Sequence, residues 1–182
     1  NVGRRKSWAA GDAVSRAIEL SEISILKDEK YEGILKDKTW GFESVFFEEE
    51  MLTFGKSLDN WVINNVLFKV LYPAEFHGQS AVEAAVQLSE EYLEKQETIK
   101  EVVIETHEPA IRIISNKEIL NNASDRDHSL EYMVSAALLF GDVTSESYEE
   151  SFHGYEDIEE LRKKIKVIEN PNFTETYYEF EK

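Results

Sequence analysis

The feature that most constrains the fold is a change of apolar spacing between residues 61 and 95. Residues 61–71 are rich in β-branched and aromatic side chains, which predicts a strand. Ser80 and Glu83 then form a Ser-x-x-Glu capping box, and apolar residues recur at helical spacing behind it. This pattern predicts a helix over 81–95. The chain therefore contains both strands and helices.

The turn between these two elements carries residues suited to acid–base chemistry. Lys69, Glu75 and His77 lie on or near it, and a helix N-terminus beside them offers unpaired N–H groups to an anion. An acid, a base, a cation and an anion site so close together indicate chemistry on a carboxylate substrate. The alternative is structural: Lys69 as a solvated strand residue, Glu75 as a turn residue and His77 as a second cap.

Elsewhere the apolar pattern predicts three more helices and one more strand. The helices cover residues 7–25, residues 130–138 and a last stretch from 157 to 165, and the strand covers 101–106. Asn170-Pro171-Asn172 is typical of a turn.

Polar residues and a glycine mark the expected bounds of the helix at Leu130. Ser124 with Asp127 is expected to cap its start, and Gly141 suits its end. Residues 112–116 favour neither helix nor strand.

The string FKVLYPAEFHGQSAVEAA, at residues 68–85, resembles the MmgE/PrpD family. Further stretches match family motifs in the same order along the chain, at residues 8–17, 106–114, and 121–133 continuing into 138–141. The resemblance spans nearly the whole chain.

The resemblance implies an α+β fold preceded by helices. Family members combine an all-helical large domain with a smaller α+β domain, and they are considerably longer than this chain. Residues 1–64 would be the C-terminal part of the helical domain. Residues 65–182 would be the small domain, incomplete, with a few strands packed by helices. The chain is then expected to be a fragment that lacks other active-site residues.

The resemblance also implies an activity. It indicates a hydro-lyase of propionate catabolism that removes water from 2-methylcitrate to give 2-methylaconitate. Other family reactions, decarboxylation of cis-aconitate or epimerisation, remain alternatives. So does a non-catalytic module that serves dimerisation. As a fragment, the isolated chain is expected to be inactive.

Three residues are the predicted catalytic groups. His77 is the expected general acid/base, because a histidine titrates near neutrality and a helix N-terminus favours its neutral form. Lys69 would hold a substrate carboxylate or donate a proton. Glu75 would orient one of these two.

Arginines are the predicted substrate-binding residues. The net charge is -17, so a tricarboxylate would be repelled unless cations gather at its site. Arg16, Arg112 and Arg126 fall inside the family-like motifs and are the candidates. The alternative is that they pair with structural carboxylates such as Asp12 and Asp125.

The amino-acid composition limits which cofactors and partners we expect. Without cysteine, these residues cannot hold a cysteine-bound iron–sulfur cluster. Asp125, Asp127 and His128 are better read as caps than as metal ligands, so no metal or cofactor is expected. The acidity argues against nucleic acid, and no apolar run is long enough for a membrane helix. We expect a cytoplasmic homodimer that takes a small tricarboxylate substrate.

Overall fold

The structure, a computed structural model, describes residues 8–26, 33–47, 53, 55, 64, 66 and 71–180. The chain divides into two compact units, Ser7–Leu67 and Phe68–Lys182, with Asn1–Lys6 grouped with the second. That the first unit is the end of a larger helical domain stays a prediction.

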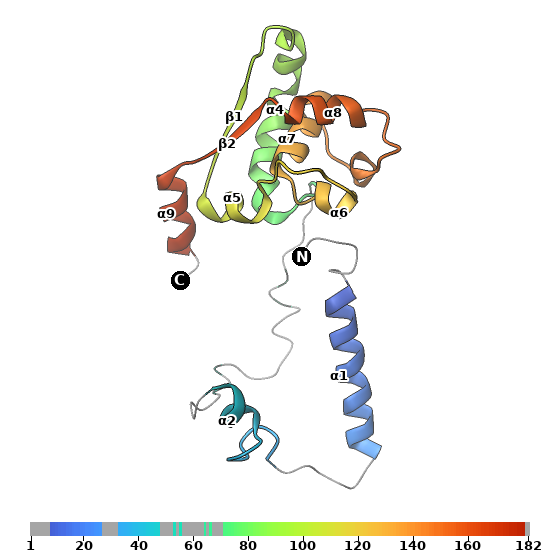
Figure 1. The fold of residues 1–182 in the computed structure, drawn as a ribbon, viewed down its shortest axis with the longest axis vertical. Helices are drawn as coiled ribbons and strands as arrows, with labels where there is room; N and C mark the ends of the chain where they lie inside the picture. The colour runs from blue at the N-terminus through green and yellow to red at the C-terminus, as the bar shows by residue number, and fades with distance from the viewer. Residues whose placement is uncertain are drawn as a thin grey trace. The chain divides into compact units, whose positions relative to one another are not determined.

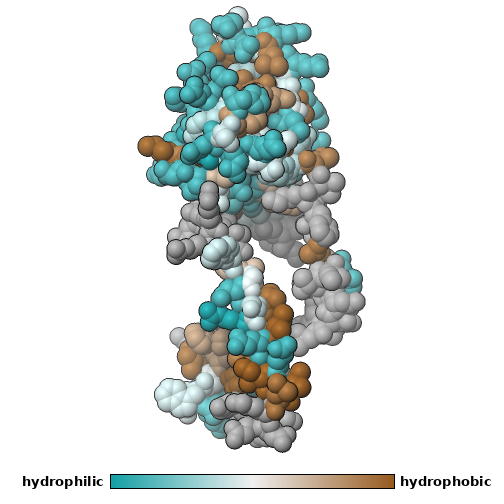
Figure 2. All heavy atoms as spheres, turned by 90° about the vertical axis from the view of Figure 1, so that its right-hand side faces the viewer, coloured by the Kyte–Doolittle hydropathy of each residue, from teal (hydrophilic) through white to brown (hydrophobic). Residues whose placement is uncertain are grey.

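In the described part of the first unit, the helices are α1 (Trp8–Leu26) and α2 (Phe42–Phe46). The predicted helix over 7–25 is confirmed by α1, whereas α2 was not predicted. None of the residues of α1 is buried, and Figure 2 shows apolar side chains at the surface of this unit. These include Trp8, Ile18, Leu20, Ile25, Trp40 and Phe46, each more than half exposed. As described, this unit therefore contains little core of its own.

The second unit contains a two-stranded parallel sheet packed by helices, which confirms the predicted α+β class (Figure 1). Its elements follow in the order η1 (Phe76–Gly78), α4 (Gln79–Lys95), β1 (Val102–Thr106), α5 (Glu108–Ile114), α6 (Ala123–Arg126), α7 (Leu130–Phe140), η2 (Ser145–Tyr148), α8 (Tyr155–Arg162), β2 (Ile165–Glu169) and α9 (Pro171–Phe180). In the sheet, Val102 lies opposite Ile165 and Thr106 lies opposite Glu169.

Helix α7 is the centre of the core. Every residue from Leu130 to Leu138 is buried, and α4 packs along it more extensively than any other element. Apolar residues on all sides are typical of a helix surrounded by other elements. Gly141 ends the helix with a φ of 68°, as predicted, because glycine adopts this left-handed conformation without steric cost.

The predicted cap of α7 is wrong. The N-cap is Ser129, whose hydroxyl accepts a hydrogen bond from the Tyr132 N–H at 3.3 Å. Ser124 lies instead within the separate short helix α6, and Asp127 ends that helix. Two short helical segments in succession give two sets of capping residues, and the first set was assigned to the wrong helix.

The C-terminal region also differs from its prediction. Helix α8 ends at Arg162 and does not continue to Ile165, which begins strand β2. Residues 165–168 include three β-branched side chains, and β1 offers them a pairing edge. The predicted turn at Asn170 is the start of α9, since Pro171 occupies the first helical position, where proline is favoured.

The start of α4 determines the position of the candidate site. The predicted capping box is wrong, because α4 begins at Gln79 directly after η1, with Gly78 as its N-cap. A Cβ atom on Gly78 would lie 2.9 Å from the Met133 side chain, so glycine lets this turn approach α7 closely. The predicted strand over 61–71 lies almost wholly outside the described residues.

Candidate acid–base site at His77

Glu75 and His77 form a hydrogen-bonded pair at the turn that leads into α4. The His77 Nδ1 atom lies 3.0 and 3.1 Å from the two Glu75 carboxylate oxygens. The backbone N–H of His77 also donates to Glu75, at 2.7 Å. The two side chains are each 16% exposed, so solvent reaches them only in part. The sequence predicted these two residues together, and the structure brings them into contact.

Side-chain hydrogen bonds hold the turn that carries this pair. The Gln79 amide Nε2 donates to the carbonyl oxygens of Tyr72 and Ala74, at 3.1 and 2.8 Å. These bonds tie the first turn of α4 to the chain immediately before Glu75. The backbone on either side of Glu75 is therefore linked by these bonds.

Tyr177 is a third member of the site and was not predicted. Its hydroxyl oxygen lies 3.2 Å from His77 Nε2, although the two residues are 100 positions apart. Tyr177 comes from α9, the helix whose start was misread as a turn. Local sequence patterns carry no signal for such a contact, because it depends on where α9 packs.

His107 completes the cluster. Its ring stacks on the Tyr177 ring, with centroids 4.5 Å apart and an interplanar angle of 21°. The His107 and His77 ring centroids are 5.6 Å apart. His107 Nδ1 accepts a hydrogen bond from the Ala110 N–H at 3.1 Å and so caps α5. Two histidines, one tyrosine and one glutamate thus share one small volume.

The electrostatics of the cluster keep Glu75 ionised. Burial raises the pKa of Glu75, but the hydrogen bonds and charge of His77 and the charge of His128 outweigh it and hold the pKa below its ordinary value. Burial also lowers the pKa of His107, and the charge of His77 lowers it further. The site therefore favours a carboxylate at Glu75 and a neutral ring at His107.

The tautomer of the His77 ring follows from its partners. A carboxylate only accepts hydrogen bonds, so Nδ1, which faces Glu75, carries the ring proton. In the neutral ring Nε2 then has a lone pair, which can accept a hydrogen bond from the Tyr177 hydroxyl 3.2 Å away. This arrangement orients a histidine for general acid–base work.

The other predicted site residues are placed differently. Lys69 lies outside the described residues. Arg112 is on the exposed surface of α5, and its Nε donates to the Glu108 carboxylate at 3.0 Å. That carboxylate raises the pKa of Arg112. Arg16, in the first unit, pairs with Asp12 at 2.8 Å, the partner that the structural alternative named.

Arg126 is buried in the core. Its side chain is 2% exposed. Its guanidinium donates to the carbonyl oxygens of Tyr148 and Leu120 and lies 5.4 Å above the centroid of the Tyr155 ring. These contacts satisfy the cation within the protein. The predicted contact with substrate gains no support from this placement.

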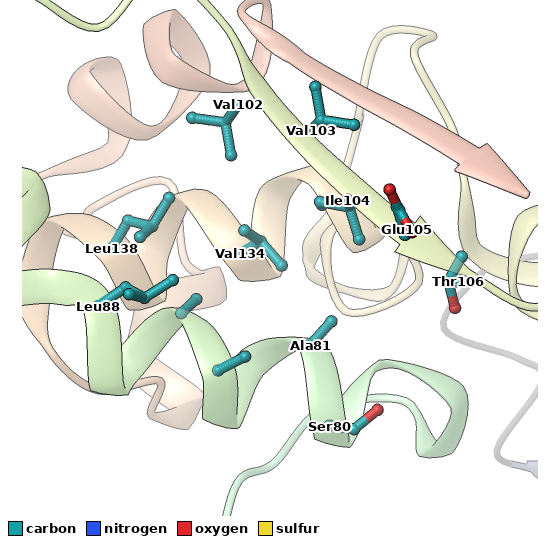
Figure 3. A pocket seen from close by; sticks show the side chains of 12 residues that line it. Ser80, Ala81, Leu88, Val102, Val103, Ile104, Glu105, Thr106, Val134 and Leu138 are labelled. Atoms are coloured by element: carbon teal, nitrogen blue, oxygen red, sulfur yellow. The ribbon is translucent and has the colours of Figure 1, made fainter. Parts of the chain in front are cut away.

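An apolar pocket lies apart from the acid–base cluster. It has a volume of about 250 Å³ and lies between α4, β1 and α7 (Figure 3). Leu88, Val102, Ile104, Val134 and Leu138 line it, with Ser80 and Thr106 at one end. None of Glu75, His77 or Tyr177 lines it. Among the described residues, no group of histidine and acidic side chains is arranged to hold a metal ion.

Comparisons with known proteins identify the family of the second unit. Residues 72–182 match the MmgE/PrpD C-terminal domain. The matched range contains the whole acid–base cluster. No helix in the described part of the chain is long and apolar enough to cross a membrane.

Several curated relatives align with essentially the whole chain. It is 46% identical over 185 residues to a 2-methylcitrate dehydratase of Salmonella typhimurium, covering 100% of this chain and 38% of that protein. The Escherichia coli K12 relative of the same name is 45% identical, with the same coverage. A mitochondrial 2-methylcitrate dehydratase of Yarrowia lipolytica is 40% identical, covering 98% of this chain and 35% of that protein. The chain thus spans little more than a third of these relatives.

Proposed function

Because the chain belongs to the MmgE/PrpD family, we propose that it forms part of a hydro-lyase that removes water from 2-methylcitrate to give 2-methylaconitate. The observation that supports this most directly is the Glu75–His77 pair, held within the family domain by hydrogen bonds to both oxygens of the carboxylate. Relatives that carry the dehydratase name align with the chain over its full length.

The proposed reaction needs a base, an acid and cations. A base removes the proton next to a carboxylate, an acid protonates the departing hydroxyl group, and cations balance the charge of the substrate. We assign the acid–base role to His77, with Glu75 holding its tautomer and stabilising the ring when it takes up a proton. Lys69, Arg16 and Arg112 stay proposed contacts for the substrate carboxylates.

Substitution of His77 tests its role. In the longer parent protein, His77→Asn removes the acid–base group, so kcat should fall by about a hundredfold to ten-thousandfold with the melting temperature nearly unchanged. The matched control is His153→Asn, since His153 is exposed and lies outside the cluster. A near-normal kcat in His77→Asn would remove it from the mechanism. Unfolding of the variant would favour the structural alternative.

The activity itself is tested by comparing substrates. The parent protein should form an unsaturated product from 2-methylcitrate, and citrate and cis-aconitate assayed beside it separate this reaction from decarboxylation. The 182-residue chain alone should be inactive, because catalysis depends on positioned groups from all parts of the site. Turnover by the chain alone, comparable to that of the parent, would contradict this expectation. Homodimerisation and a cytoplasmic location stay predictions.

Arg112 tests the electrostatic part of the proposal. Arg112→Lys keeps the charge but loses the planar fork, so KM of the parent should rise, and Arg112→Ala should raise it further. The existing ion pair with Glu108 is exposed, so either change should cost little stability. Unchanged KM in both variants would show that Arg112 does not bind substrate.

A further inference from the structure

Both ring nitrogens of His77 have partners within the chain. Nδ1 donates its proton to Glu75, and Nε2 lies 3.2 Å from the Tyr177 hydroxyl. Nε2 is the nitrogen with the lone pair, and it would be the base of the proposed reaction. The Tyr177 oxygen is the hydrogen-bond partner of this nitrogen, so it offers Nε2 a path for a proton.

We propose that Glu75, His77 and Tyr177 form a proton relay in which the Tyr177 hydroxyl is the group that exchanges a proton with the substrate. The inference rests on the proposed function, because it names the Tyr177 oxygen as the atom of the same acid–base site that contacts the substrate. It changes which residue touches the reacting carbon. His77 becomes the acceptor behind the tyrosine, and Glu75 becomes the anion that stabilises the protonated ring.

Contacts between α9 and α5 place Tyr177 against His77. The Glu108 N–H donates to the Thr174 hydroxyl at 2.9 Å. The stacked ring of His107 supports the flat face of Tyr177. These two contacts along α9 therefore position the hydroxyl that faces Nε2.

The start of α9 is also fixed. The side chain of Asn170 accepts a hydrogen bond from the Asn172 N–H at 3.0 Å. The Asn170 N–H donates to the carbonyl oxygen of Thr106, the last residue of β1, at 2.8 Å. The helix is thus anchored to the sheet at one end and to α5 along its side.

The relay accounts for each proton and electron pair that moves when the substrate loses water. Nε2 of His77 takes the hydroxyl proton of Tyr177 while the tyrosine oxygen takes the proton from the substrate carbon. The electron pair of that C–H bond becomes the new carbon–carbon double bond, and hydroxide leaves the neighbouring carbon. The proton on His77 then returns through the tyrosine oxygen to the hydroxide, which becomes water. All three residues end in their starting protonation states.

The experiment compares two tyrosines of the same helix in the parent protein. Tyr177→Phe removes the hydroxyl from Nε2, and kcat should fall by about a hundredfold to ten-thousandfold with little change in KM. Tyr178→Phe is the matched control, because it removes a hydroxyl that contacts Glu108 and leaves His77 untouched. Its kcat should stay within about twofold of wild type.

A spectroscopic measurement on the 182-residue chain gives a readout independent of activity. The ¹⁵N resonances of the His77 ring should show a protonated Nδ1 and a hydrogen-bonded Nε2. Tyr177→Phe should move the Nε2 resonance to that of a nitrogen without a donor, and Tyr178→Phe should leave it in place. Circular dichroism of both variants verifies that they remain folded.

The outcomes separate the relay from the proposed function. If the wild-type parent forms no unsaturated product, the proposed function is wrong, and the relay as a catalytic device falls with it even where the resonance responds. If the wild type is active and Tyr177→Phe keeps its kcat, the relay is wrong while the proposed function stands. A loss of kcat without a change at Nε2 would likewise overturn the relay. A loss of kcat together with the shift supports it.

Discussion

His107 links the stability of the fold to the acid–base cluster. Its Nδ1 atom accepts the capping hydrogen bond of α5, which requires that nitrogen to be unprotonated. The same ring packs against Tyr177. Burial and the charge of His77 lower its pKa from the ordinary 6.5, with Glu108 and Glu75 opposing the shift. The folded chain therefore binds a proton at His107 less readily than the unfolded chain does.

The lowered pKa of His107 predicts how the free energy of unfolding depends on pH. Because the folded pKa of His107 lies below the unfolded value, its contribution is present above about pH 6.5 and is lost as the pH falls through the folded value. Urea unfolding between pH 8 and 5.5 should show this decline, above the range where Glu75 titrates. His107→Asn keeps a good capping residue and removes the titration, so its stability should vary less. An unchanged slope in the variant would assign the decline to other groups.

Arg126 yields a second prediction at this scale. Arg126→Ala removes a buried side chain and its hydrogen bonds to Tyr148 and Leu120, so the free energy of unfolding should fall by about 2–4 kcal/mol. Arg112→Ala, on the exposed surface, is the control and should leave the free energy of unfolding nearly unchanged. If Arg126→Ala instead raised KM and left the melting temperature unchanged, its predicted role in substrate binding would be favoured.

Sequence patterns predicted one part of the site and missed another for a physical reason. Glu75 and His77 are two positions apart, so a local reading places them together. Tyr177 reaches His77 only after α9 has packed on α5, and no spacing rule describes that contact. The burial of Arg126 was missed for the same reason, since its partners Tyr148 and Leu120 lie 22 and 6 residues away.

At the scale of elements, the ends of the helices were harder to predict than their presence. Periodicity identified α1, α4 and α7, whose apolar faces are long. Strand β2 was read as the end of a helix, because an apolar residue at helical spacing also suits the first position of a short strand. Only the pairing with β1 shows that this residue begins a strand and does not end a helix. The apolar pattern therefore predicted only one of the two strands of the sheet.

The junction of α7 and α8 offers a prediction at this scale. Gly154, the N-cap of α8, lies against the Phe140 ring at the end of α7, and a Cβ atom there would overlap that ring. Gly154→Ala should lower the free energy of unfolding by about 1–3 kcal/mol through overpacking. In the background of Phe140→Leu the same change should cost less, because the ring is gone. Equal costs in the two backgrounds would mean that the overlap is not the cause.

At the scale of the whole molecule, the buried apolar core formed by the described residues lies within the second unit. All buried members of the core cluster fall between Ala74 and Ile165, and α1 contributes none of them. Residues 68–182 expressed alone should therefore keep the cooperative thermal transition of the full chain, measured by circular dichroism. Loss of that transition would show that the first unit supports the core. The sequence did not predict that the core lies in one unit, because apolar residues recur at helical spacing in α1 as clearly as in α4.

The distance along the chain between His77 and Tyr177 has a consequence during synthesis. The two residues are 100 positions apart, and Tyr177 belongs to the last helix that the structure describes. At roughly 5–20 residues per second, a ribosome adds Tyr177 about 5–20 seconds after His77. For that time a nascent chain carries the histidine without its hydroxyl partner, and for most of it without β2, the strand that pairs with β1. Assembly of the cluster can therefore only follow translation of Tyr177, so a polypeptide interrupted before that residue would lack the relay.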